Sequence, residues 1–103
     1  MSACHSYHID ATIKNHTGGA ISLLEVDYPS ASFGADALAS GNEFHYRFQT
    51  RDSGPLKVQY TGANQKQVQI TGPTLYEKQE GRIEIDLLPN GKAEFNPSLN
   101  PAH

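Results

Sequence analysis

Apolar residues recur at every second position in short segments of this chain, and glycine or proline interrupts the pattern about every ten residues. A period of two places alternate side chains on opposite faces of a β-strand, whereas an α-helix repeats every 3.6 residues. The segments run over residues 7–14, 44–49, 56–61, 67–71 and 83–88, and a shorter one ends at Phe95. Their number and spacing predict an all-β fold, an antiparallel β-sandwich of about seven strands.

Residues 20–28 form a further strand segment in which the alternation breaks. Ile21 and Leu23 fall on one parity, whereas Leu24 and Val26 fall on the other. A β-bulge between Leu23 and Leu24 would bring both sets onto the core face. A strand with one face partly covered by a loop would produce the same pattern.

Two segments are predicted to lie outside the strands. Residues 33–38 are short and rich in alanine, which favours a crossing between the sheets with one 3₁₀ turn. Residues 96–101 contain two prolines, which remove backbone donors and are expected to end the last strand. The predicted organisation is therefore a flexible segment or tether at 1–6, a sandwich at 7–96 and a tail at 97–103.

In two predicted hairpins, the core residues of both strands must lie on the same face of the sheet, and this requirement fixes the loop length. A three-residue loop at 89–91 keeps the core residues of both flanking strands on one face, with a type I turn followed by Gly91 in the left-handed region. In the other hairpin, Tyr60 must share a face with Val68, which requires an odd number of loop residues. The expected loop is 63–65.

Composition and charge exclude several classes of protein. The formal net charge is −3 and the pI is about 5.9, which argues against general affinity for nucleic acid or anionic membranes. No run of about 18 apolar residues exists, so no transmembrane segment is predicted. One cysteine excludes an internal disulfide and any multi-cysteine metal site. Nucleophile and phosphate-binding motifs are absent, so the protein is predicted not to be an enzyme and to need no cofactor.

The N-terminal segment contains the strongest candidate metal ligands. Cys4, His5 and His8 offer up to three soft or borderline donors within five residues. The competing interpretation is a flexible terminus whose donors never converge. His16 and His45 are expected to be separate surface residues, because a metal site needs converging partners.

Three carboxylates are predicted to gather on one strand pair. Glu84 and Asp86 share an outward strand face, and Glu94 is expected across from Asp86. Alternation with core residues is typical of a solvated face, so acid–base catalysis is not predicted there. The triplet at 15–17 formally matches a glycosylation acceptor.

The remaining candidate is a flat polar binding surface. Two neighbouring strands place Lys57, Gln59, Gln67 and Gln69 outward, and Arg47 and Gln49 are expected to extend this face. A solvated sheet face would show the same pattern. The predicted face lacks exposed aromatic platforms, which argues against a dedicated carbohydrate or single-strand binder.

Several turn and core motifs carry a resemblance to a known family. They are residues 27–34, 38–48, 53–58 and 72–77. Together they resemble short exported bacterial proteins of unassigned function with an immunoglobulin-like β-sandwich, over about residues 13–96. The resemblance implies an immunoglobulin-like antiparallel β-sandwich and export, and it brings no catalytic residue.

The first residues bear on cell location. Ser2 and Ala3 before Cys4 fit the small positions of a lipoprotein box, with Met1 where leucine is usual. Either the chain starts just inside a lipoprotein signal and Cys4 carries a lipid tether in the cell envelope, or Met1 is the true start of a cytoplasmic protein. The favoured function is a non-catalytic exported accessory or binding domain with a protein partner, and the alternative is a small metal-binding protein.

Overall fold

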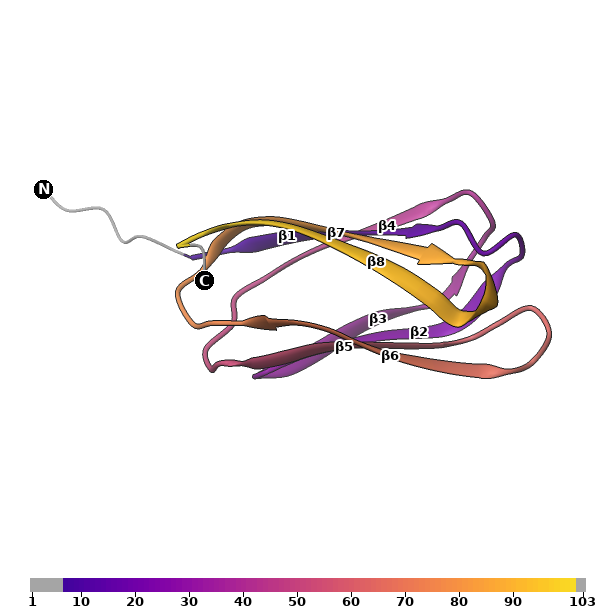
Figure 1. Cartoon of the computed structure of the whole chain (residues 1–103), viewed down its shortest axis with the longest axis horizontal. Coiled ribbons are helices and arrows are strands. Elements are labelled where there is room, and N and C mark those ends of the chain that lie inside the picture. The colour runs from indigo at the N-terminus through magenta and orange to yellow at the C-terminus, as the bar shows by residue number, and fades with distance from the viewer. Residues whose placement is uncertain (1–6, 102–103) are drawn as a thin grey trace, which may run out of the picture.

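The structure is a computed structural model that describes residues 7–101. Within this range eight strands form two four-stranded sheets packed face to face (Figure 1). In chain order they are β1 (Ile9–Asn15), β2 (Ile21–Tyr28), β3 (Ala31–Leu38), β4 (Glu43–Phe48), β5 (Gly54–Thr61), β6 (Gln67–Leu75), β7 (Glu80–Leu88) and β8 (Lys92–Asn100), with a 3₁₀ turn at Pro89–Gly91. No helix in the described part is long and apolar enough to cross a membrane.

The strand order confirms an all-β sandwich and corrects its topology. One sheet has the order β4-β1-β7-β8 and the other β3-β2-β5-β6. The first sheet is mixed, because β1 runs parallel to β7 with Ile9 beside Gly81, so the prediction of antiparallel sheets throughout is wrong. The immunoglobulin-like topology is not confirmed either. In an immunoglobulin constant domain the first strand lies at a sheet edge, whereas β1 lies between β4 and β7.

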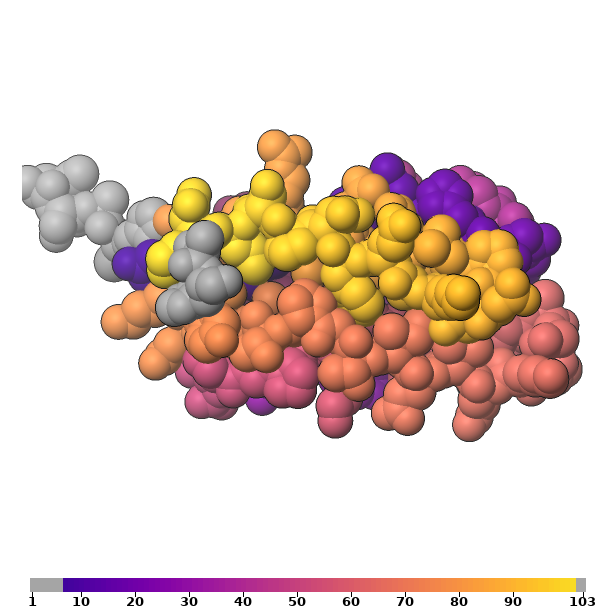
Figure 2. All heavy atoms as spheres, in the orientation of Figure 1, coloured from indigo at the N-terminus to yellow at the C-terminus, as the bar shows by residue number. Residues whose placement is uncertain are grey.

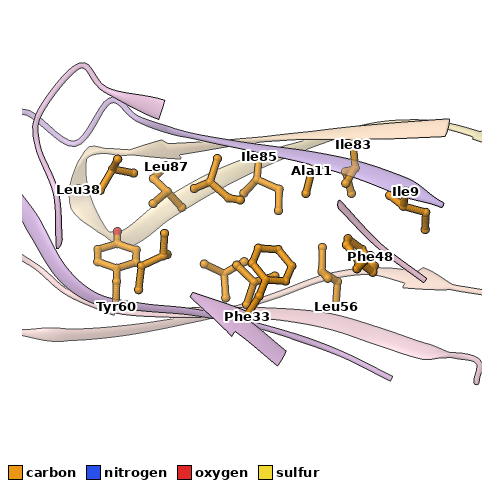
Figure 3. Close-up of a cluster of buried hydrophobic side chains, with 14 of the residues drawn as sticks. Ile9, Ala11, Phe33, Leu38, Phe48, Leu56, Tyr60, Ile83, Ile85 and Leu87 are labelled. Atoms are coloured by element: carbon orange, nitrogen blue, oxygen red, sulfur yellow. The ribbon is translucent and has the colours of Figure 1, made fainter. Parts of the chain in front are cut away.

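The hydrophobic core fills the space between the two sheets (Figure 3). Aliphatic side chains from β1 and β7 face those of β2 and β5, as the period-two pattern predicts. The fully buried large hydrophobic side chains are Ile9, Ile13, Ile21, Val26, Leu56, Val58, Leu75, Ile83, Ile85 and Leu87. Alternate residues of these strands therefore remain on the outer faces of the sandwich.

Both predicted hairpin registers are confirmed. In the β7–β8 hairpin Leu87 pairs with Ala93 around the loop 89–91. Gly91 has the expected positive φ of 72°, but Asn90 is also left-handed with a φ of 66°, so the turn is not a type I turn. Asparagine tolerates this conformation better than most residues, which explains how two consecutive left-handed residues fit there.

The β5–β6 hairpin likewise has the expected pairing of Tyr60 with Val68. The Gly62 backbone N–H donates to the Lys66 carbonyl over 2.8 Å, which leaves 63–65 as the loop. Gln65 adopts a positive φ of 68° at its last position. A left-handed residue there is usual for three-residue hairpin loops.

The parity break in β2 is a bulge. The pairing of β2 with β5 shifts by one residue between Ser22 and Glu25. Ile21 and Leu24 are both buried, as the bulge predicts, but Leu23 is 67% exposed rather than in the core. The bulge places Leu23 on the outer face, and its side chain is therefore available to solvent.

Residues 33–38 form an edge strand, so the predicted crossing with a 3₁₀ turn is wrong. β3 pairs antiparallel with β2, with Phe33 beside Val26 and Leu38 beside Ile21. β3 consists mostly of small residues, so its sequence shows no clear alternation of apolar and polar side chains. Gly34 is small for a structural reason, because a Cβ there would overlap the Leu24 carbonyl oxygen of the neighbouring strand.

The last strand also runs further than expected. β8 continues to Asn100 and stops directly before Pro101, so the predicted strand end at Asn96 is wrong. Pro97 pairs with Ile83 within the ladder. Because β8 lies at a sheet edge, a residue without a backbone N–H is tolerated there.

Asn15, at the end of β1, is fully buried and uses its whole hydrogen-bonding capacity. Its Nδ2 donates to the carbonyls of Gly19 and Leu38, both over 2.9 Å. Its Oδ1 accepts from the Thr17 backbone N–H over 3.0 Å and from the Thr17 hydroxyl over 2.7 Å. The side chain therefore joins the β1–β2 turn to the end of β3, and it is inaccessible as a glycosylation acceptor.

The backbone of Asn15 adds contacts to the same end of the sandwich. Its N–H donates to the Asn42 carbonyl over 3.0 Å, and its carbonyl accepts from the Gly41 N–H over 2.8 Å. The next residue, His16, donates to the Leu87 carbonyl over 2.8 Å. At this end the chain crosses between the sheets twice, in the β1–β2 and β3–β4 connections. Hydrogen bonds of Asn15 hold both connections.

We predict that Asn15→Ala lowers the free energy of unfolding by about 3 kcal/mol, because it leaves buried donors and acceptors unpaired. Urea denaturation of both proteins measures this difference. Asn64→Ala is the matched control, since the exposed Asn64 side chain accepts one hydrogen bond, from the Lys66 N–H. Equal losses in the two variants would contradict the role assigned to Asn15.

Candidate functional site

Four of the six predicted surface residues lie together on the outer face of the sheet β3-β2-β5-β6. Gln59 of β5 pairs with Gln69 of β6, and Thr61 pairs with Gln67. Lys57 follows on the same face of β5. Cross-strand neighbours on one face lie about 5 Å apart, so the amide groups form a continuous polar strip.

The other two predicted residues lie elsewhere. Arg47 belongs to β4 in the opposite sheet, where its Nε lies 3.7 Å from Asp10 Oδ1. The side chain of Gln49 lies against His8, with 3.3 Å between the two Nε2 atoms. The expectation that Arg47 and Gln49 extend the strip is therefore wrong. Alternation gave the correct face of each strand, but it carried no information on which sheet β4 joins.

A shallow groove of about 530 Å³ runs beside the amide strip. It lies where the β2 bulge meets β5 and β6. The lining residues are Leu23, Glu25, Gln59, Tyr60, Thr61, Gln67, Val68 and Gln69. We call this surface, centred on the exposed Leu23 side chain, the bulge groove.

Leu23 is the unusual member of the bulge groove. It has a positive φ of 53°, a conformation that costs a residue with a Cβ about 1–2 kcal/mol. Because the leucine side chain is exposed, its burial contributes little free energy that could offset the backbone strain. A glycine or asparagine would satisfy the bulge at lower cost. The fold alone therefore gives no reason for leucine at this position.

Two carboxylates give the bulge groove an acidic border. Glu25 lines the groove beside Leu23, and Asp27 follows it on the same face of β2 outside the groove lining. The hydrogen bond and negative charge of Asp27 raise the pKa of Glu25, because ionisation would leave two like charges in contact. Lys57 pairs with Asp27 across the strands, and a further cation beside Glu25 would relieve the remaining repulsion.

The metal prediction falls largely outside the described residues, since Cys4 and His5 lie there. His8 is described, and its Nδ1 is buried without a hydrogen-bond partner. Among residues 7–101 no three histidine, cysteine or acidic side chains converge as a metal site would require. Metal binding at Cys4, His5 and His8 therefore stays a prediction.

The two other histidines within the described range lie beside carboxylates on the outer face of the first sheet. His45 Nε2 is 2.9 Å from Glu43 Oε1, and His16 Nε2 is 3.9 Å from Asp86 Oδ1. Both are well exposed, as expected for separate surface residues.

The carboxylate group forms as predicted, but Asp86 is less solvated than expected. Asp86 lies across from Glu94, and its side chain is only 16% exposed. Burial raises the pKa of Asp86, and the charge and hydrogen bond of Glu84 raise it further, against the opposing effect of His16 and Lys14. Lys14 forms an ion pair with Glu84 at 3.2 Å.

An aromatic stack at the β3–β4 edge was not found from the sequence. Tyr46 shares the parity of Phe44 and Phe48 in the alternating segment 44–49, yet it is 42% exposed. Its ring stacks on Phe33, with centroids 4.3 Å apart and planes at 14°. The edge position exposes it, because β3 and β4 belong to different sheets and leave that side open. The alternation of apolar and polar residues does not reveal which strands lie at the edge of a sheet.

The fold and its surfaces define a small two-sheet β-sandwich domain. Neither a protein-family model nor a curated protein sequence matches the chain. The NMR structure of a protein from Eubacterium rectale aligns with it over 100% of both chains, with a TM-score of 0.65 and 12% identity. At this identity the likeness shows the fold alone, a β-sandwich that resembles that of a bacterial protein.

We predict that Asp86→Asn raises the melting temperature at pH 7 and leaves it nearly unchanged at pH 3. The pKa of Asp86 is higher in the folded chain than its ordinary 3.8, so the folded state binds the proton more tightly. Stability is then lost as the pH rises above about 4 and Asp86 ionises.

Thermal unfolding at the two pH values measures this effect, with Asp36→Asn on the exposed face of β3 as the control. A lower melting temperature for Asp86→Asn at pH 7 would contradict the prediction. It would mean that attraction to His16 and Lys14 outweighs burial and the repulsion from Glu84.

Proposed function

We propose that this chain is a non-catalytic binding domain that docks a protein partner in the bulge groove. The observation that carries the proposal is the combination at Leu23, whose backbone is strained and whose side chain is 67% exposed. Both features cost stability, and a partner that buries the leucine would recover part of that cost. Buried apolar anchors surrounded by polar groups are typical of protein interfaces.

The residues around Leu23 indicate which side chains the partner would carry. Glu25 and Asp27 favour a basic side chain, because a cation would relieve their repulsion. Gln59 already hydrogen-bonds Glu25, and the amides of Gln67 and Gln69 offer hydrogen bonds to backbone or side-chain groups of a partner. The partner segment would therefore carry an apolar residue next to lysine or arginine.

The cellular setting of this proposal comes from the sequence. We place the domain outside the cytoplasm as an exported accessory protein, with Cys4 as a lipid tether if a signal segment precedes it. A metal bound at Cys4, His5 and His8 is the alternative, and it excludes that tether because lipid on Cys4 removes its thiolate. Zinc titration of the wild type against a Cys4→Ser, His5→Ala double variant separates the two.

We predict that Leu23→Asn weakens partner binding at least about tenfold without loss of stability. Asparagine adopts a positive φ more readily than leucine, so the variant should fold at least as well as the wild type. The probe is a displayed library of random 12-residue peptides, selected on the wild-type protein. Synthetic versions of the enriched peptides should contain an apolar residue beside a basic one and bind Leu23→Asn at least about tenfold more weakly.

Lys78→Asn is the matched control, because Lys78 is also left-handed, with a φ of 66°, but lies in the turn after β6. It should relieve similar backbone strain and bind the peptides like the wild type. Equal binding of the peptides by the wild type and Leu23→Asn would contradict the proposal, as would enriched peptides without the apolar and basic pair.

A further inference from the structure

A second hollow lies at the end of the sandwich where Asn15 is found. Three connections line it, namely the β1–β2 turn, the β5–β6 loop and the β7–β8 turn, which meet at one end of the molecule in Figure 1. Its volume is about 600 Å³. In Figure 2, β6 and β8 form much of the visible surface near this end of the molecule. We call it the end cavity.

Tyr60 lines the end cavity with a polar group that the fold leaves unused. The residue is only 4% exposed, and its hydroxyl points between the sheets toward Leu38 and Leu87 (Figure 3). The hydroxyl has no hydrogen-bond partner among residues 7–101. Burial alone raises the pKa of Tyr60, so the phenol is neutral and can donate its proton.

Among residues 7–101 the buried polar atoms without a partner are His8 Nδ1 and Asp86 Oδ1, so the unpaired Tyr60 hydroxyl is open to solvent. The unpaired group of Tyr60 is therefore suited to a hydrogen bond with a ligand.

The other lining groups indicate the charge of that ligand. Lys66 is the single charged residue among those that line the end cavity, and no carboxylate is present. Asn64 uses its oxygen to accept from the Lys66 N–H, which leaves its amide N–H groups free to donate. Val68 and Leu88 add apolar surface. One cation, amide donors and an apolar wall favour a small anion with an apolar body over a neutral sugar, whose hydroxyl donors would need acceptors.

We infer that the end cavity binds a small carboxylate with an apolar side chain, either free or as the C-terminal residue of a polypeptide. Lys66 attracts the carboxylate at the rim, Tyr60 donates to a carbonyl oxygen of the ligand, and Val68 and Leu88 contact its side chain. The end cavity adjoins the bulge groove and shares Tyr60, Gln67 and Val68 with it, but Leu23 lines only the bulge groove and Lys66 only the end cavity.

The probe is N-acetyl-leucine, titrated into the ¹⁵N-labelled protein and followed by amide chemical shifts. Shifts are expected at Gly18, Asn90 and Gly91, which line the end cavity. N-acetyl-leucinamide, which lacks the charge, should bind at least about fivefold more weakly. An acetylated tetrapeptide that ends in leucine distinguishes the sources: tighter binding assigns the site to a chain terminus, and equal binding to a free carboxylate.

Two variants test the assigned roles. Tyr60→Phe should weaken binding of N-acetyl-leucine about fivefold or more while leaving the melting temperature unchanged or higher, which a purely structural hydroxyl would not do. Lys66→Gln should reduce the preference for the acid over the amide. Tyr46→Phe and Lys57→Gln are the matched controls, since neither residue lines the end cavity.

Binding of the acid and the amide with equal affinity would overturn the proposal. Unchanged affinity in Tyr60→Phe would do the same, as would an absence of shifts at the end cavity.

Discussion

The side chain of Asn15 is the interaction on which the rest of the structure depends. A sandwich of two sheets needs chain crossings, and each crossing brings backbone groups out of the ladders into the interior. At one end these groups meet Asn15, whose amide contacts Thr17, Gly19 and Leu38. An aliphatic residue here would leave several of them unpaired. The β1–β2 turn, one of the three connections that frame the end cavity, is held in place through this residue.

The two candidate binding surfaces share a physical logic. In both, one residue differs from what stability alone would select. Leu23 is strained and exposed where asparagine or glycine would suit the bulge, and Tyr60 carries a hydroxyl without a protein partner where phenylalanine would pack. Sequences are usually consistent from local to global level, and departures concentrate at functional sites. That principle connects the proposals, although different residues and different measurements test them.

The sequence predicted those elements whose side chains alternate clearly. The registers around Tyr60 and Leu87 followed from parity, because a slip of one residue would turn core side chains outward. β3 was missed because Gly34 is dictated by a neighbouring strand rather than by its own segment. The extension of β8 through Pro97 depends on its edge position. The separation of Arg47 from the amide strip depends on which sheet β4 joins. These features are tertiary, and no local pattern encodes them.

Asn15 holds one end of the sandwich closed through the hydrogen bonds of its side chain. Hydrogen exchange of its side-chain amide, followed by NMR, tests this most directly. Both Nδ2 protons are hydrogen-bonded and buried, so they should exchange only when the whole domain unfolds. If they exchange as fast as the side-chain amide of the exposed Asn64, this end of the sandwich opens independently and the account is wrong.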